Sequence, residues 1–330
     1  MAPNPIPPDI CREIALLSSR REVAALSLVS SWCSSILSPV LYRNITIGDG
    51  SRGLIKTLAR VPEKAILVRS LIFHGSRCVY IDDDEWAQAL TLLINLHHLT
   101  VTHHVPMAWT SLPFIRFRLR SFTSSALLVG AWVGFLHLQP DLQALCLHSD
   151  LLGQIPGPDV LPALRRLTGR IEELSKFASV HPLESLGFRI GPSWAVGLKA
   201  RDIERFQSGP TRLVTLRVCS AVLCRLFRDV PAILGTLKDL ALDEDQSWSR
   251  NPVTGQRTLL RAAGAFAIHT PALRSLTLVC SPSNRPLTGC DSVLIDKADE
   301  FSSAIWRKCS TSPRLDTFHF CASDVGRTYR

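Results

Sequence analysis

Two pairs of neighbouring histidines, His97-His98 and His103-His104, are the residues in this sequence that invite a metal-binding interpretation. Imidazole nitrogens are common zinc ligands, and a structural zinc site takes four ligands in total. No cysteine or carboxylate stands at a supporting spacing, and neighbouring residues of a strand point to opposite faces. The sequence therefore predicts no metal site at these pairs, and it indicates no cofactor.

Motifs of known catalytic chemistry are also missing from the sequence. It contains no G-x-G-x-x-G, no Walker A and no G-x-S-x-G motif. The acids from Asp82 to Glu85 lack the spacing and the glycine of an EF-hand calcium loop. They fit the first turn of a helix better, where negative charge is favourable. We therefore expect a protein that is not an enzyme.

Several arginines offer a different chemistry, which is the recognition of anions. A guanidinium group can bind a carboxylate or a phosphate through two parallel hydrogen bonds. We expect four arginines to lie on neighbouring strands and to bind an acidic or phosphorylated segment of a target protein: Arg166, Arg170, Arg189 and Arg217. The alternative is that they are ordinary solvated charges on an exposed sheet.

This placement depends on a short phrase that returns from residue 66 onward: apolar, two variable residues, apolar, one variable residue, apolar. Its ten copies are VRSLIF (68–73), LHHLTV (96–101), LRSFTS (119–124), LQALCL (142–147), LRRLTG (164–169), LESLGF (183–188), LVTLRV (213–218), LKDLAL (237–242), LRSLTL (273–278) and LDTFHF (315–320). An L-x-x-L-x-L phrase that recurs every 20 to 30 residues is typical of leucine-rich repeats.

Each phrase predicts one short strand, and the residues between phrases supply a helix or an irregular crossing. One unit cannot bury its apolar side alone, so stacked units share a continuous core. The residues between the leucines then point outward and form the binding face. The early units offer Ser70, Ile72, His74, His98, Thr100 and Thr102, and the unit at 237 offers Asp239 and Asp243. The stretches 243–256 and 281–292 are rich in turn-forming residues and predict exposed loops.

The opening 47 residues have a different pattern, which predicts short helices. Pro7 and Pro8 suit a first helical turn, and Ile10, Ile14 and Leu17 follow at helical spacing.

A second and a third helical piece follow. Ser19 and Glu22 have the spacing of a capping box, and the second helix would carry Val23, Leu26, Val29 and Trp32 at steps of three. Pro39 would interrupt the next helical piece, and residues 42–47 look extended.

Together, IPPDICREI, VAALSLVSSW and PVLYRNITI resemble the F-box, and the whole layout resembles fungal F-box proteins with leucine-rich-repeat-like units. The resemblance implies that the F-box binds a Skp-family adaptor and, through it, the cullin of a ubiquitin ligase, while the repeats recruit a target. The adaptor-binding residues would be Pro7, Pro8, Ile10, Ile14, Leu17, Leu26, Val29 and Trp32. One residue fewer separates Val29 from Trp32 than is usual in that family. On one continuous helix this would turn Trp32 by about 100°.

The expected fold class is α+β, with a small all-α F-box-like helical module followed by an irregular α/β leucine-rich-repeat solenoid. We expect the module at 1–47, a linker or capping helix at 48–65 and the repeat array at 66–330. A unit of about 40 residues rarely folds alone, which favours docking to a partner. The alternative is a protein-binding scaffold unrelated to ubiquitin, whose helices merely cover the end of the array.

Composition narrows the setting of the protein. The opening residues lack the basic patch and apolar run of a secretory signal, and the longest apolar run, 126–136, is shorter than the roughly 20 residues of a membrane span. We expect the cytoplasm, the nucleus or both, no membrane, and ten cysteines that are mostly buried free thiols. The net charge of +9 allows nucleic acid as a partner, but the scattered arginines and few aromatic residues make it the least favoured one.

Overall fold

The computed structural model describes residues 6–48, 51–75, 83–103, 115–125, 130–148, 156–188, 200–210, 212–218, 223, 226, 229, 231–243, 270, 272–280, 316–322 and 325–329. The chain divides into two compact units, Met1–Ala163 and Leu164–Arg330. Within the described residues, no helix is long and apolar enough to cross a membrane.

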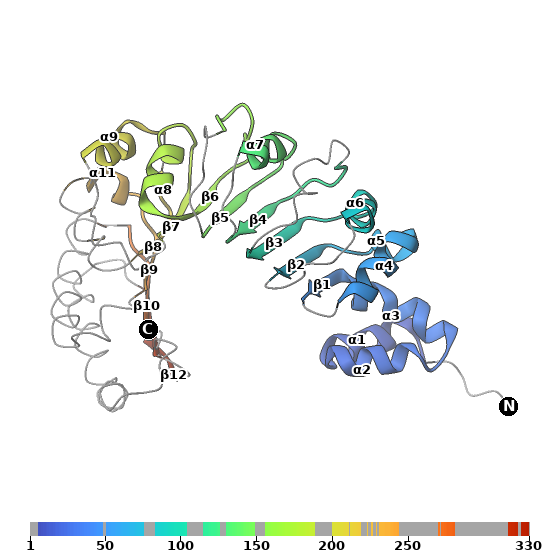
Figure 1. Cartoon of the computed structure of the whole chain (residues 1–330). Helices are drawn as coiled ribbons and strands as arrows, with labels where there is room; N and C mark the ends of the chain where they lie inside the picture. Colours follow the sequence, from blue (N-terminus) through green and yellow to red (C-terminus); the bar gives the residue numbers. More distant parts are fainter. Residues whose placement is uncertain are drawn as a thin grey trace, which may run out of the picture. The chain divides into compact units, whose positions relative to one another are not determined.

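The first unit opens with three helices and then alternates strands with helices. Its elements are α1 (Pro8–Leu17), α2 (Arg20–Ser27), α3 (Ser31–Arg43), β1 (Asn44–Ile47), α4 (Arg52–Arg60), α5 (Pro62–Ala65), β2 (Ser70–Gly75), α6 (Asp83–Leu92), β3 (His98–His103), β4 (Ser121–Ser124), α7 (Gly130–His137) and β5 (Ala144–Leu147). Strands β1 to β5 pair in parallel and in chain order. Helices α4, α6 and α7 lie on one side of these strands (Figure 1).

The core of the first unit lies between these strands and the helices. Leu71 of β2 is buried and stands in register with Ile45 of β1 and Leu99 of β3, which are buried too. Two residues after Leu71 on the same strand, Phe73 contacts Trp86 of α6, with ring centroids 5.3 Å apart. The period of two along each strand therefore separates a buried face from an outward face, as the repeated phrase predicts.

The sheet begins before the first repeated phrase, because β1 (Asn44–Ile47) pairs with β2. Asn44 pairs with Ser70 in the same parallel register as the later strands. The expectation of extended chain from residue 42 is wrong in its start, because α3 continues to Arg43. Helices α4 and α5 occupy most of 51–65. The domain limits after residues 47 and 65 stay predictions.

The second unit repeats the arrangement of strand and crossing. Its elements are β6 (Arg166–Gly169), α8 (Ile171–Ala178), β7 (Ser185–Phe188), α9 (Ala200–Ser208), β8 (Thr215–Val218), α11 (Pro231–Leu234), β9 (Asp239–Asp243), β10 (Ser275–Cys280), β11 (Thr317–Ala322) and β12 (Val325–Tyr329). Strands β6 to β11 pair in parallel and in chain order, and β12 returns antiparallel to β11.

All ten repeats of the phrase contain a strand, from β2 for VRSLIF to β11 for LDTFHF. The described strands and helices thus form a leucine-rich-repeat-like α/β fold. The predicted loops at 243–256 and 281–292 lie outside the described residues, except for Asp243 at the end of β9.

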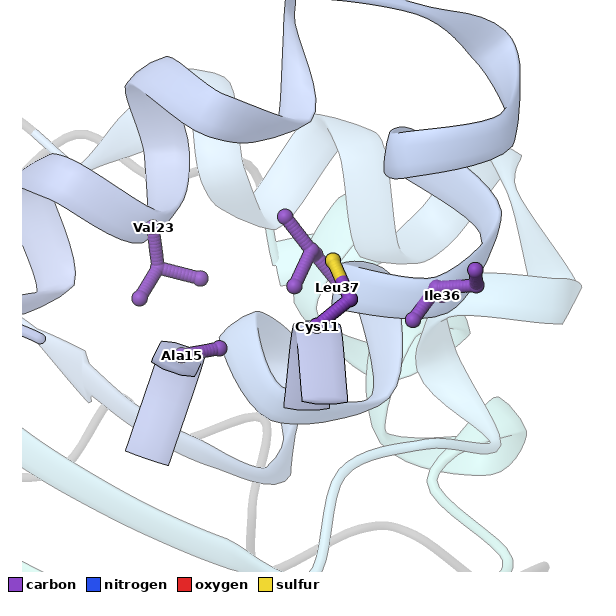
Figure 2. Packing of buried hydrophobic residues seen from close by; sticks show 5 residues of the cluster. All are labelled: Cys11, Ala15, Val23, Ile36 and Leu37. Atoms are coloured by element: carbon purple, nitrogen blue, oxygen red, sulfur yellow. The ribbon is translucent and has the colours of Figure 1, made fainter. Parts of the chain in front are cut away.

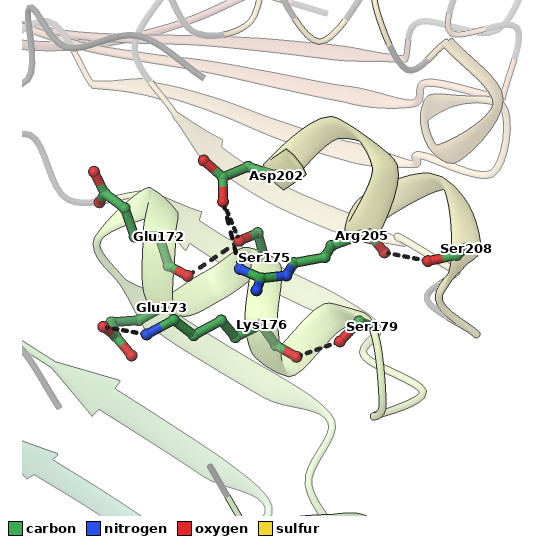
Figure 3. Close-up of polar contacts among 8 residues, drawn as sticks. All are labelled: Glu172, Glu173, Ser175, Lys176, Ser179, Asp202, Arg205 and Ser208. Carbon is green, nitrogen blue, oxygen red and sulfur yellow. Dashed lines mark hydrogen bonds and ion pairs between the residues drawn. The ribbon is translucent and has the colours of Figure 1, made fainter. Parts of the chain in front are cut away.

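Polar contacts join the successive helices α8 and α9 (Figure 3). The Ser175 hydroxyl donates to Asp202 Oδ1 at 2.8 Å, and Arg205 Nη1 lies 3.7 Å from the same oxygen. Asp202 is almost fully buried. A buried carboxylate is costly unless it has hydrogen-bonding partners. The Ser175–Asp202 hydrogen bond joins α8 to α9, and the Arg205 contact lies within α9.

The described cysteines agree in part with the expectation of buried thiols. Cys11, Cys33 and Cys146 are thiols outside any disulfide, and Cys11 is buried whereas Cys33 and Cys146 are only half-buried. Cys146 occupies an outward position of β5, where it contacts the imidazole Nε2 of His148 at 3.1 Å.

Candidate protein-docking surfaces

Helix α1 begins as its two prolines predict. Pro7 is the N-cap and Pro8 the first helical residue, where the missing N–H costs no helical hydrogen bond. Asp9 lies in the first turn and forms an exposed ion pair with Arg12 at 3.6 Å. The helix ends at Leu17, and the Ser18 hydroxyl donates to the Ile14 carbonyl at 2.7 Å.

Helix α2 begins with the predicted capping box, which is confirmed. The Ser19 hydroxyl accepts from the Glu22 backbone N–H, and the Ser19 backbone N–H donates to Glu22 Oε2 at 2.7 Å. These hydrogen bonds with Ser19 favour the charged carboxylate and lower the pKa of Glu22.

The prediction that Val29 and Trp32 continue the second helix is wrong. Helix α2 ends at Ser27, and α3 begins at Ser31 with Ser30 as its N-cap. The Ser30 hydroxyl accepts from the Cys33 backbone N–H at 3.0 Å, so the sequence SS before the tryptophan starts a new helix. The rotation expected of Trp32 on one continuous helix therefore does not arise.

The expected interruption at Pro39 is also wrong, because α3 runs through it to Arg43. Proline has no N–H to donate to the carbonyl four residues before it, which weakens one turn. Ile36 and Leu37 just before it are buried, and Val40 and Leu41 just after it pack against the same cluster. Tertiary packing on both sides of Pro39 thus outweighs the local cost.

A small core holds the three helices together (Figure 2). Cys11 and Ala15 of α1 and Val23 of α2 meet Ile36 and Leu37 of α3. Most of these side chains are small, so the cluster buries little apolar surface for three helices. Most of the larger apolar side chains of α1 and α2 lie outside this cluster.

The predicted adaptor-binding residues are all exposed. The exposed fractions of the larger side chains are 52% for Ile10, 45% for Ile14, 88% for Leu17, 38% for Leu26, 72% for Val29 and 36% for Trp32. Pro7 and Pro8 are exposed as well. Among the described residues, nine of the thirteen exposed large hydrophobic side chains lie between residues 6 and 32. We call these nine side chains the apolar docking face: Ile6, Ile10, Ile14, Leu16, Leu17, Leu26, Leu28, Val29 and Trp32.

The predicted arginine cluster is spread out rather than compact. Arg166 and Arg217 are exposed on β6 and β8, but Arg217 stands in register with Thr168 rather than with Arg166, through Gly187 of β7. Strand spacing and rise put these two Cα atoms about 12 Å apart. Arg170 is the half-buried N-cap of α8, and Arg189 lies outside the described residues. A role of these arginines in target binding stays a prediction.

Sequence reasoning missed a row of basic residues that precede the strands of the first unit. They occupy the second letter of the repeated phrase, which the pattern treats as variable: Arg69, His97 and Arg120. Arg43 holds the same place before β1. Comparison of the second letters across the ten phrases is the signal that could have found this row.

No family model matches the chain, and no curated protein matches it in sequence. Among solved structures, the chain is similar to one from the crystal structure of the Rad7 and Elc1 complex in yeast. That similarity has a TM-score of 0.44 at 15% identity and covers 88% of this chain and 84% of the other. A second similarity is to the crystal structure of the TLR13–ssRNA13 complex, with a TM-score of 0.30 at 13% identity over 79% of this chain and 30% of the other.

Proposed function

We propose that the chain is an adaptor that joins two other proteins. Helices α1 to α3 dock to a Skp-family subunit, and through it to the cullin of a ubiquitin ligase, while the repeats hold the protein to be modified. The chain would contribute proximity and orientation rather than chemistry. The resemblance of residues 6–47 to the F-box supplies the partner's class.

The exposed apolar docking face is the observation that carries this proposal. Contiguous apolar surface on a folded chain marks a place where another protein binds. Residues Ile10, Ile14 and Leu17 fall on one side of α1 because helical neighbours are three or four residues apart. Leu17, Leu28 and Val29 are more than 70% exposed, which costs free energy in water unless a partner covers them.

The alternative is that the same helices only cover the end of the repeat array. A cover would bury its apolar side chains against the array. Within the first unit, helix α3 supplies the contacts to β1 and α5, with Ile36 and Leu37 buried. The apolar side chains of α1 and α2 outside the small core are exposed. This distribution favours docking over covering.

The test is co-expression of the chain with a Skp-family subunit, followed by pull-down. The variant Leu17→Asp, Val29→Asp changes two residues that touch little within the chain. Each introduced carboxylate would be desolvated in an apolar interface, so we expect capture to weaken about 100-fold or more.

The matched control is Ile66→Asp, Ile94→Asp, which changes two exposed isoleucines outside the docking face. Full capture by the control and loss by the docking-face variant would support the proposal. Absence of capture by the unchanged, soluble chain would contradict it and favour the scaffold with a helical cover.

A further inference from the structure

The basic row of the first unit consists of Arg43, Arg69, His97 and Arg120, each directly before one of the strands β1 to β4. The three arginines are exposed and His97 is half-buried. The same place before β5 holds Gln143, which is uncharged and exposed. Four basic side chains thus stand on four consecutive strands.

Backbone hydrogen bonds fix the spacing of this row. The Arg69 N–H donates to the Arg43 carbonyl at 2.8 Å, the His97 N–H to the Arg69 carbonyl at 2.9 Å, and the Arg120 N–H to the His97 carbonyl at 2.7 Å. Three strand spacings of about 4.8 Å make the row about 14 Å long, which is the length of about four extended residues. The backbone positions of the row are therefore fixed by the sheet, and the row has the span of a short peptide.

The acidic side chains that the structure describes do not pair with the arginines of the row. Among the described residues, none of the ion pairs includes Arg43, Arg69 or Arg120. The acids at the start of α6 follow the carboxyl end of β2, whereas Arg69 precedes its amino end. One of them, Glu85, lies 3.7 Å from Lys56.

His97 shows the effect of this arrangement on a titratable group. Partial burial is the largest cause that lowers its pKa, and the positive charges of Arg120, Arg69 and His98 lower it further. A backbone hydrogen bond with Asn95 acts in the opposite direction. All the charges that act on this imidazole are positive, so an added anion at the row would be stabilised by several cations at once.

The second unit provides an internal comparison. The same place before its strands is occupied by Arg165, Glu184, Val214, Lys238, Arg274 and Asp316, linked by the same kind of backbone hydrogen bonds. Arg165 and Glu184 form an ion pair at 3.8 Å. The fold therefore accepts acidic, apolar and basic residues at this place. The presence of basic residues alone before β1 to β4 is therefore not a requirement of the fold.

The side chains beside the row favour a protein segment over a nucleic acid. Binding of single-stranded nucleic acid relies on aromatic side chains that stack on bases. The outward positions of β1 to β5 hold no Phe, Tyr or Trp. They hold hydroxyl groups next to the row, such as Ser70 and Ser121, and Ser121 lies 2.8 Å from the imidazole Nδ1 of His98. Hydroxyl and imidazole groups can donate to peptide carbonyls and carboxylates.

We infer that the basic row binds an extended anionic segment of the target protein through its carboxylate or phosphate groups. This inference rests on the proposed function, because it names the class of target that the repeats hold. Arg43, Arg69 and Arg120 would each pair with one anionic group, and the neighbouring hydroxyls would bind the backbone of the segment.

The test measures binding of labelled hexaglutamate, and of a peptide with phosphoserines at alternate positions, to the full chain without any adaptor. We expect Arg69→Glu, Arg120→Glu to weaken binding of the preferred peptide at least about tenfold. The control Lys238→Glu, Arg274→Glu makes the same change of net charge at the same place before β9 and β10, and should weaken binding less than about twofold. Arg69→Gln, Arg120→Gln provides a milder second variant, and circular dichroism checks that all variants fold.

Tighter binding of hexaglutamate identifies carboxylates as the recognised groups, and tighter binding of the phosphopeptide identifies phosphates. An equal loss in the two charge-reversed variants would overturn the inference, as would tighter binding of hexauridylate RNA or no binding of either peptide. Failure here is distinguishable from failure of the proposed function. The docking-face variant should keep peptide binding, and the row variant should keep adaptor capture.

Discussion

His97 is the side chain whose titration reports most directly on its surroundings. Replacement of Arg120 by glutamine removes one of the positive charges that lower its pKa, so we expect the His97 pKa to rise. Proton NMR of the imidazole against pH measures this change. The control Lys238→Gln lies in the other unit and should leave the titration unchanged. An unaltered His97 pKa in Arg120→Gln would show that the charge of Arg120 does not contribute to the shift.

The sign of the stability effect follows from the same shift. The folded chain binds a proton at His97 less readily than the unfolded chain does. Its contribution to stability is therefore present above the unfolded-state pKa and is lost as pH falls through the folded-state pKa. Binding of an anionic segment would act in the opposite direction and raise the His97 pKa.

Sequence patterns predicted single side chains well where the interaction is local. Ser19 and Glu22 are three residues apart, and this spacing was sufficient to predict the capping box. The basic row joins residues more than 20 positions apart, and it becomes visible only when the strands are aligned. The misplacement of Arg217 has a different cause. It is the fifth letter of its phrase, as Thr168 is, whereas Arg166 is the third letter, so alignment of the phrases already separates the two arginines.

Gly209 lies close to the end of helix α8, whereas Gly53 has open space around it. A Cβ atom on Gly209 would clash with the Ala178 carbonyl oxygen, and that backbone cannot move aside easily. We expect Gly209→Ala to lower the free energy of unfolding by about 1–3 kcal/mol, measured by chemical denaturation. Gly53 lies in α4 and has nothing within 4 Å of its Cβ position. The matched change Gly53→Ala should stabilise the chain by up to about 1 kcal/mol. A neutral Gly209→Ala would show that the two segments can separate.

Helices and strands followed the sequence where their periodicity was strong. The ten phrases gave ten strands because each alternates buried and outward residues over a short span. The division between α2 and α3 was missed because steps of three from Val23 to Trp32 suit one helix, whereas the Ser30 cap starts another. Strand β12 was missed because residues 325–329 lack the leucine phrase and pair antiparallel with β11.

For the entire chain, the two proposed surfaces should act independently. They use different residues, namely the apolar docking face and the basic row, and contributions from separate sites add. We expect the unchanged chain to bind a Skp-family subunit and an anionic peptide at the same time. Analytical ultracentrifugation with both partners measures this ternary complex. Competition between the two partners would contradict separate surfaces.

Alignment of the strands shows where part of the net charge of +9 lies on the molecule. Composition alone could predict a basic surface but could not locate it, because the basic residues are scattered along the sequence. Alignment of the strands gathers three of the arginines that contribute to this charge, Arg43, Arg69 and Arg120, in one row with His97. For residues 6–32 the sequence predicted helices with apolar side chains at helical spacing. The structure adds which of these residues form the small core and which remain at the surface.

The order in which the strands pair also bears on how the protein is made. In each unit every strand pairs with the strand that precedes it in the chain. A ribosome releases the chain from its amino end, so each new strand meets a partner that has already emerged. Helices α1 to α3 and the four basic strand starts are synthesised before the later repeats. The docking face can therefore meet its partner while the later repeats are still being translated.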